Sequence, residues 1–233
     1  MKLIKHFDFQ NESALNLNDW NIRVGDKWAN NELQHYVDNE KNLYFEDGLV
    51  INATIENGVY HSSRIDTKGK FYMKYGRIDA VVQFPKGVGT WPAFWMLSEN
   101  NTYGTWPRSG EIDIVEHVGR DLDTVFLCLH TEAHNHRNAS QYFTEFTEEN
   151  LSDGFHTYSI IWDEKSITYL VDDIQRAKYV KGEDGFDPTE KGWPFDNDFY
   201  LIINLAIGGT FGGEVDSSVF PQKFIVKDIK IFQ

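Results

Sequence analysis

The chain has 233 residues, of which 41% are hydrophobic and 15% aromatic, enough to fill the core of one domain over residues 1–233 and still line a cleft. Its formal net charge of −14 at pH 7 argues against nucleic acid, anionic lipid or a sulfated polysaccharide as a partner. No apolar stretch approaches the roughly 20 residues of a membrane-spanning helix, so we expect no membrane contact.

The first residues, Met1–Lys5, lead directly into His6-Phe7-Asp8 without the hydrophobic region of roughly 7–15 residues that a signal peptide needs. The sequence itself therefore predicts no secretion signal.

Alternation of apolar and polar residues, rather than a helical period, continues along the chain. Turn signals such as Asp47-Gly48 and Asn57-Gly58 separate the segments, and only Thr147–Leu151 is predicted to form a helical turn. Many short strands at such spacing are typical of an all-β sandwich or barrel. The predicted strands are Leu49–Ala53, Gly76–Phe84, Val125–His130, Thr157–Trp162, Ile167–Val171, Phe199–Asn204 and Phe224–Phe232.

Three tryptophans, Trp91, Trp95 and Trp106, lie within sixteen residues of one another. Trp91 and Trp95 are four residues apart and would share one face of a strand. Pyranose rings present an apolar C–H face that stacks on indole, so the group resembles a sugar platform. The alternative is that these tryptophans belong to the core, as large aromatic residues often do.

Directly after the tryptophans, one strand-like run carries three carboxylates. Glu111 and Asp113 are two residues apart and point to the same face of a strand, with Ile112 on the other face. Glu116 has the wrong parity for that face unless a one-residue bulge intervenes, and such bulges are common beside active sites. Two glutamates aimed into one cleft are the groups that cleave a glycosidic bond. A solvated acidic strand is the alternative.

The remaining reactive residue types offer weaker signals. Cys128, the single cysteine, lies in an apolar run and is interpreted as a small core residue. His130 and His134 have a spacing that binds zinc on a helix, but no general-base glutamate follows the first histidine and the run follows a strand. We therefore expect no catalytic zinc.

Several motifs together resemble the bacterial laminarinase branch of glycoside hydrolase family 16. The runs WPAFWML at Trp91–Leu97, SGEIDIVEHVG at Ser109–Gly119 and NNELQ at Asn30–Gln34 carry the resemblance. The similar lichenase branch has one residue fewer between its aspartate and second glutamate. Further similar segments, in family order, are Tyr75–Ala80, Phe155–Tyr158, Ile161–Asp163, Asn204–Gly209 and Val226–Ile229.

The resemblance implies a β-jelly roll of two stacked antiparallel sheets, with a concave sheet that forms the substrate cleft. It also implies a retaining mechanism in which Glu111 is the nucleophile, Glu116 the general acid/base and Asp113 the residue that tunes the pair. The implied substrate-binding residues are Asn31, Arg64, Trp91, Trp95, Trp106 and His130.

A structural calcium site away from the cleft is also implied by the resemblance, while catalysis needs no cofactor. The matching positions are Asp8, the carbonyl of Gly48, and Asp228, which offer oxygen ligands of the kind that Ca²⁺ prefers. The alternative is that Asp228 simply alternates outward along its strand.

Three functions remain open at this point. The first is a retaining endo-β-1,3-glucanase that cleaves laminarin-like chains and mixed-linkage β-1,3-1,4-glucan. The second is a non-catalytic β-glucan-binding module, although binding alone has no need of three carboxylates. The third is a family 16 enzyme for another polysaccharide, such as a galactan. We expect a monomer, and the family resemblance implies secretion.

Overall fold

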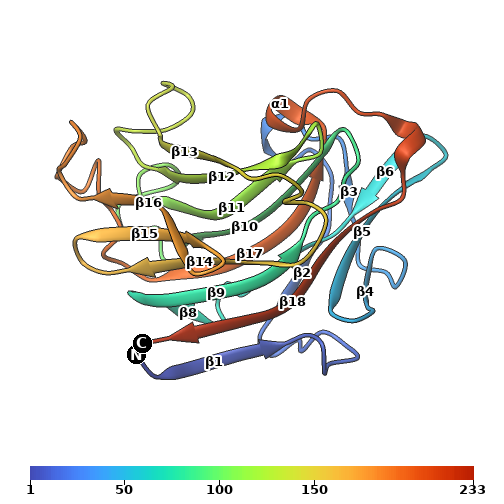
Figure 1. Ribbon diagram of the computed structural model, residues 1–233, viewed down its shortest axis with the longest axis horizontal. Coiled ribbons are helices and arrows are strands. Elements are labelled where there is room, and N and C mark those ends of the chain that lie inside the picture. Colours follow the sequence, from blue (N-terminus) through green and yellow to red (C-terminus); the bar gives the residue numbers. More distant parts are fainter.

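The computed structural model describes residues 1–233 as two stacked β-sheets with very little helix (Figure 1). Most neighbouring strands are antiparallel; β3 and β6 pair in parallel. No helix combines the length and the apolar character needed to cross a membrane. Besides the strands there are only η1 (Ala29–Asn31), α1 (Gly209–Gly212) and η2 (Ser217–Val219).

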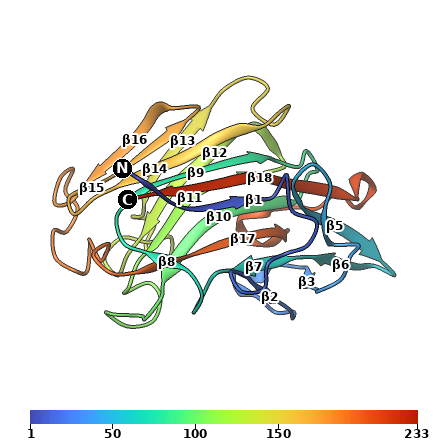
Figure 2. The same cartoon turned by 90° about the horizontal axis from the view of Figure 1, so that it is seen from below.

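The larger sheet has ten strands in the order β16-β15-β14-β9-β18-β5-β6-β3, with β1 paired to β18 and β4 to β5. Because β1 and β18 are neighbours, the two termini lie side by side (Figures 1 and 2). Its strands are β1 (Leu3–Asp8), β3 (His35–Tyr36), β4 (Leu43–Phe45), β5 (Leu49–Glu56), β6 (Val59–Ser62), β9 (Gly76–Gln83), β14 (His156–Trp162), β15 (Ser166–Val171), β16 (Ile174–Val180) and β18 (Gln222–Phe232).

The smaller sheet, called the cleft sheet below, has eight strands in the order β13-β12-β11-β10-β17-β7-β2, with β8 paired to β17. Figure 1 shows β13, β12, β11, β10 and β17 one below another. Its strands are β2 (Asn21–Arg23), β7 (Arg64–Asp66), β8 (Tyr72–Met73), β10 (Thr90–Ser98), β11 (Glu111–Val118), β12 (Asp121–His130), β13 (Tyr142–Thr147) and β17 (Phe199–Ile207).

The main core is one cluster of 40 buried residues. Strand β12 shows how the sequence builds it: Val125, Leu127 and Leu129 join that cluster, whereas Phe126 and Cys128 belong to a separate small cluster. This period of two leaves every second residue of the cleft sheet for the opposite face.

All seven predicted strands are confirmed, with ends that differ by a few residues. The predicted helical turn over Thr147–Leu151 is wrong. Thr147 ends β13 and pairs with Thr124 of β12, so it is held extended. Asn150 has a φ of 66°, in the left-handed region that breaks a helix, and Leu151 closes only a single turn onto Glu148.

Candidate active site

The predicted bulge is present in β11 and brings the three carboxylates onto one face. From Asp113 to Glu116 the chain advances three residues, while the partner strand β12 advances only two, from Cys128 to Phe126. The register on the β10 side shifts at the same place. The parity of Glu116 is thereby restored, and Glu111, Asp113 and Glu116 all line one cavity.

That cavity has a volume of about 340 Å³ and lies on the face of the cleft sheet away from the core. Its walls come from β7, β10, β11 and β17 and from the loops that carry Trp28, Trp106 and His136. The lining residues are Trp28, Ala29, Asn30, Glu32, Arg64, Trp91, Ala93, Trp95, Leu97, Trp106, Glu111, Asp113, Glu116, His136, Arg137, Asn204 and Ala206.

Burial raises the pKa of all three carboxyl groups. The charge of Asp113 raises the pKa of Glu111 further, and the charge of Glu116 does the same for Asp113. The indole N–H of Trp91 donates to Glu116 Oε1 at 2.8 Å, which stabilises the ionised form of Glu116. Ionisation of one carboxyl therefore disfavours ionisation of its neighbour, so the three groups titrate together and not independently.

His130 ends β12 beside the carboxylates, as predicted. Its Nε2 lies 3.2 Å from Asp113 Oδ2 and 3.8 Å from Glu111 Oε1. His134, by contrast, packs against Tyr142 and accepts the backbone N–H of Asp187 through Nε2. The two histidines therefore contact different residues and do not form the zinc pair that their spacing would suggest on a helix.

The three predicted tryptophans line the cavity and are not part of the main core. Trp95 donates its indole N–H to Asn204 Oδ1 at 2.6 Å, so its ring is held by β17. The guanidinium carbon of Arg64 lies 5.0 Å from the rings of both Trp95 and Trp28. Arg64 Nε is buried without a hydrogen-bond partner, which leaves a donor at the cavity wall.

Trp106 forms the wall next to His130. Its ring stacks with His136 at a centroid distance of 5.1 Å, and the Arg137 guanidinium carbon lies 4.6 Å from its centroid. The Trp106 indole N–H is buried without a partner. This wall combines an aromatic face with free hydrogen-bond donors, the combination that suits a sugar ring.

Two of the six predicted substrate-binding residues, Asn31 and His130, are not in the cavity lining, and several lining residues were not predicted. Asn31 is exposed and does not line the cavity, whereas Asn30 does. Both have positive φ in the tight turn at η1, which a strand-like alternation does not foresee. Trp28 and Asn204 lie in or beside family-like segments and could have been proposed. His136 and Arg137 lie in a polar loop with no signal.

Cys128 is buried and packs with Val118 and Phe126. Burial raises the pKa of its thiol well above its usual value, so it stays protonated and unreactive. It behaves as the small packed residue that the sequence predicted.

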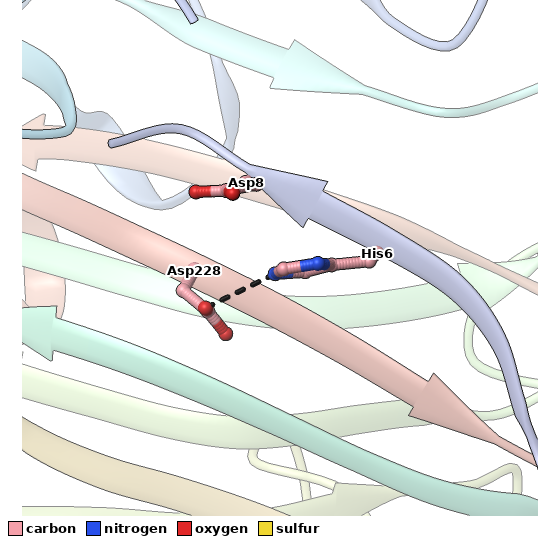
Figure 3. Close-up of side chains that lie close together, drawn as sticks. All are labelled: His6, Asp8 and Asp228. Carbon is pink, nitrogen blue, oxygen red and sulfur yellow. Dashed lines mark hydrogen bonds and ion pairs between the residues drawn. The ribbon is translucent and has the colours of Figure 1, made fainter. Parts of the chain in front are cut away.

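The predicted calcium positions lie where β1 meets β18. Asp8 and Asp228 are direct partners across the two strands, and His6 is on the same face (Figure 3). His6 Nε2 lies 3.1 Å and Lys230 Nζ 3.2 Å from Asp228 Oδ2. The two carboxylates fit Ca²⁺ as hard oxygen ligands, but His6 and Lys230 would have to leave that oxygen first.

Gly48 lies close to the same strand. A Cβ at this position would come within 2.8 Å of the Val226 carbonyl oxygen, so the glycine permits the close approach to β18. Its carbonyl accepts the N–H of Glu46 at 2.9 Å and keeps a second lone pair for a ligand.

Comparison with known proteins gives consistent matches along the chain. The model of the family described as "Glycosyl hydrolases family 16" matches residues 28–210. A β-glucanase of Rhodothermus marinus is 37% identical over 226 residues, which cover 92% of this chain and 79% of that protein.

Two solved structures are similar over the whole chain. The laminarinase of Flavobacterium sp. UMI-01 is 40% identical, with a TM-score of 0.93 and 100% of both chains covered. A mutant of SCLam, a non-specific endo-β-1,3(4)-glucanase, is 31% identical with a TM-score of 0.91, covering 100% of this chain and 94% of that one. That crystal presents 1,3-β-D-cellobiosyl-glucose at its active site.

Proposed function

The chain belongs to glycosyl hydrolase family 16, and we propose from this premise that its cavity hydrolyses β-1,3-glucan with Glu111 and Glu116 as the catalytic pair. The protein is a glycoside hydrolase of the endo-β-1,3-glucanase type. The bulge in β11 is the observation that supports the choice of these residues, because it places Glu116 on the same face as Glu111 and Asp113, and all three line one cavity.

In a retaining mechanism the Glu111 carboxylate attacks the anomeric carbon while the protonated Glu116 donates its proton to the departing glycosidic oxygen. A covalent glycosyl-enzyme results. Glu116, now ionised, takes a proton from water, and that water attacks the anomeric carbon and releases Glu111. The pKa values are raised for all three carboxyl groups together, so they do not distinguish the nucleophile from the acid/base. We assign the two roles from the positions of Glu111 and Glu116 in the family motif.

Asp113 and His130 act on the pair from one side. Asp113 lies between the two glutamates and its negative charge would oppose ionisation of both, so a proton shared within the group keeps the acid available. His130 Nε2, at 3.2 Å from Asp113, can hold that carboxyl in place. Trp91, through its bond to Glu116, fixes the position of the acid/base.

Substrate recognition is proposed for the tryptophans, Arg64 and Asn204. The rings of Trp28 and Trp95 flank the Arg64 guanidinium, and sugar hydroxyls would satisfy its unpartnered Nε. Cleavage of mixed-linkage β-1,3-1,4-glucan is part of the proposal, because SCLam, with similar structure, acts on both linkages. We also propose that the chain acts as a monomer.

We also propose that Asp8, Asp228 and the Gly48 carbonyl hold a structural Ca²⁺ that ties β1 to β18. The direct pairing of the two aspartates across these strands supports it. The ion would add no catalytic group, because the site lies in the other sheet.

Reducing-sugar release tests the function with laminarin, barley mixed-linkage glucan, lichenan, agarose and carrageenan, and the Glu111→Gln variant as the blank. We expect activity on laminarin that the variant loses. Activity on agarose or carrageenan alone would show that the substrate is a galactan, while the proposed mechanism would still apply. If no polymer releases reducing sugar but laminarin still binds, the protein is a non-catalytic glucan-binding protein.

A further inference from the structure

The register of the cleft sheet sets up a row of side chains that continues past the cavity. Trp95 of β10 is opposite Asp113 of β11, Asp113 is opposite Cys128 of β12, and Cys128 is opposite Phe143 of β13. Directly paired residues of antiparallel strands point to the same face. Phe143 therefore stands on the catalytic face, two strands or roughly 10 Å beyond Asp113.

Phe143 is the exposed end of a series of aromatic contacts that starts at the catalytic site. Its ring stacks on Phe126 at 5.7 Å with an interplanar angle of 27°. Phe126 packs on Phe211 at 4.8 Å, and Phe211 contacts Trp91 at 5.4 Å. Trp91 in turn donates to Glu116. Phe126 thus covers one side of the Phe143 ring, and Phe126 and Phe211 link that ring to Trp91 in the cavity lining.

Packing of the core does not require an aromatic residue at this position. Tyr142 and Phe146, on the other face of β13, pack into or against the main core, whereas Phe143 is 40% exposed. Single exposed apolar residues are common. Phe143 is different in its setting, because it lies on the catalytic face, stacks on Phe126 and remains open to a ligand.

Over β17 and β7, away from β12, the cavity is lined by Asn204, Arg64 and the neighbouring Trp28. Trp106, His136 and Arg137 line it from the loops before β11 and after β12. An enzyme that cuts inside a polymer must accommodate sugar units on both sides of the cleaved bond. The strands on the second side of β11 are β12 and then β13, which carries Phe143 on the catalytic face.

We propose that Phe143, supported by Phe126, is a platform on which a sugar ring of the glucan stacks, on the side of the carboxylates away from Arg64. Glu145 pairs directly with Phe126, is exposed, and offers a carboxylate to the hydroxyls of the same chain. The inference rests on the proposed function, because it takes its ligand from there.

The test measures kcat and KM of Phe143→Ala on β-1,3-linked oligosaccharides from three to six units and on laminarin. We expect the ratio of the variant's KM to the wild-type KM to increase with the length of the oligosaccharide. On the longest one the ratio should reach about five-fold, equivalent to about 1 kcal/mol of lost stacking. Phe143→Trp should restore the wild-type KM. The matched control is Ile174→Ala, which truncates another exposed apolar residue but on β16 of the larger sheet.

An equal effect of Phe143→Ala at every chain length, or none at any, would overturn the proposal, provided that its melting temperature matches that of wild type. Laminarin affinity in the Glu111→Gln background separates this outcome from failure of the proposed function. If the wild type cleaves no glucan, weaker laminarin binding after adding Phe143→Ala still supports the platform, and unchanged binding refutes it.

Discussion

His117 should make the protein sensitive to mild acid. The side chain is fully buried, its ring stacks on Phe84 at 4.8 Å, and its Nε2 lies 3.0 Å from Ser152 Oγ. Its Nδ1 has no hydrogen-bond partner. Burial lowers the pKa of His117 from 6.5 to about 4, because the imidazolium would have to be accommodated in this apolar environment.

Proton linkage determines whether acid stabilises or destabilises the folded protein. Between pH 6.5 and 4 the unfolded chain binds a proton on His117 and the folded chain does not, so acid favours the unfolded state. The stability that neutral His117 contributes is complete above pH 6.5 and is lost as the pH falls towards 4. At about 1.4 kcal/mol for each pKa unit, the loss is about 3 kcal/mol.

Urea unfolding at pH 7, 6, 5 and 4 measures this loss. We expect His117→Gln to be less stable than wild type at pH 7, but to lose about 3 kcal/mol less than wild type on going to pH 4. The difference between the two proteins isolates His117 from the other titrating groups. His35→Gln removes an exposed imidazole and is the control. Parallel pH curves for His117→Gln and wild type would refute the reasoning.

The other predictions concern the cavity and the proposed metal site. Glu111→Gln should abolish turnover while laminarin binding persists in calorimetry, and measurable turnover would contradict its role. Glu116→Gln should lower kcat on laminarin by about 10²- to 10⁴-fold yet still react with an activated aryl glycoside, whose leaving group needs no protonation. Trp95→Ala should raise KM about ten-fold without unfolding; a collapse of the melting temperature would assign Trp95 to the core. A chelator should lower the melting temperature and calcium restore it, whereas Asp8→Asn should abolish that response.

The sequence predicted the strands and the catalytic face well because both depend on period-two alternation. Val125, Leu127 and Leu129 follow it closely, and one violation of parity, at Glu116, was enough to predict the bulge. The helical turn predicted for Thr147–Leu151 was wrong because Thr147 pairs with Thr124 in the sheet, and this pairing outweighs the local helical tendency.

Residues on loops could not be placed from the sequence. His136 and Arg137 reach the cavity because the loop after β12 folds back on itself, with Asn135 bonding to the carbonyls of Thr131 and Glu132. Nothing in their spacing encodes that path. The choice between Asn30 and Asn31 depended on two positive φ values, which residue identity permits but does not dictate.

The bulge also explains how one short strand serves the core and the catalytic site together. Without it, Glu116 would follow the parity of Ile112 and Ile114 into the space between the sheets, where an unpaired carboxylate is strongly unfavourable. With it, Ile114 and Val115 both enter the core although they are consecutive. The strand therefore keeps its apolar anchor while Glu116 joins Glu111 and Asp113. The spacing that serves catalysis is also the spacing that avoids a buried charge, so the fold and the chemistry select the same bulge.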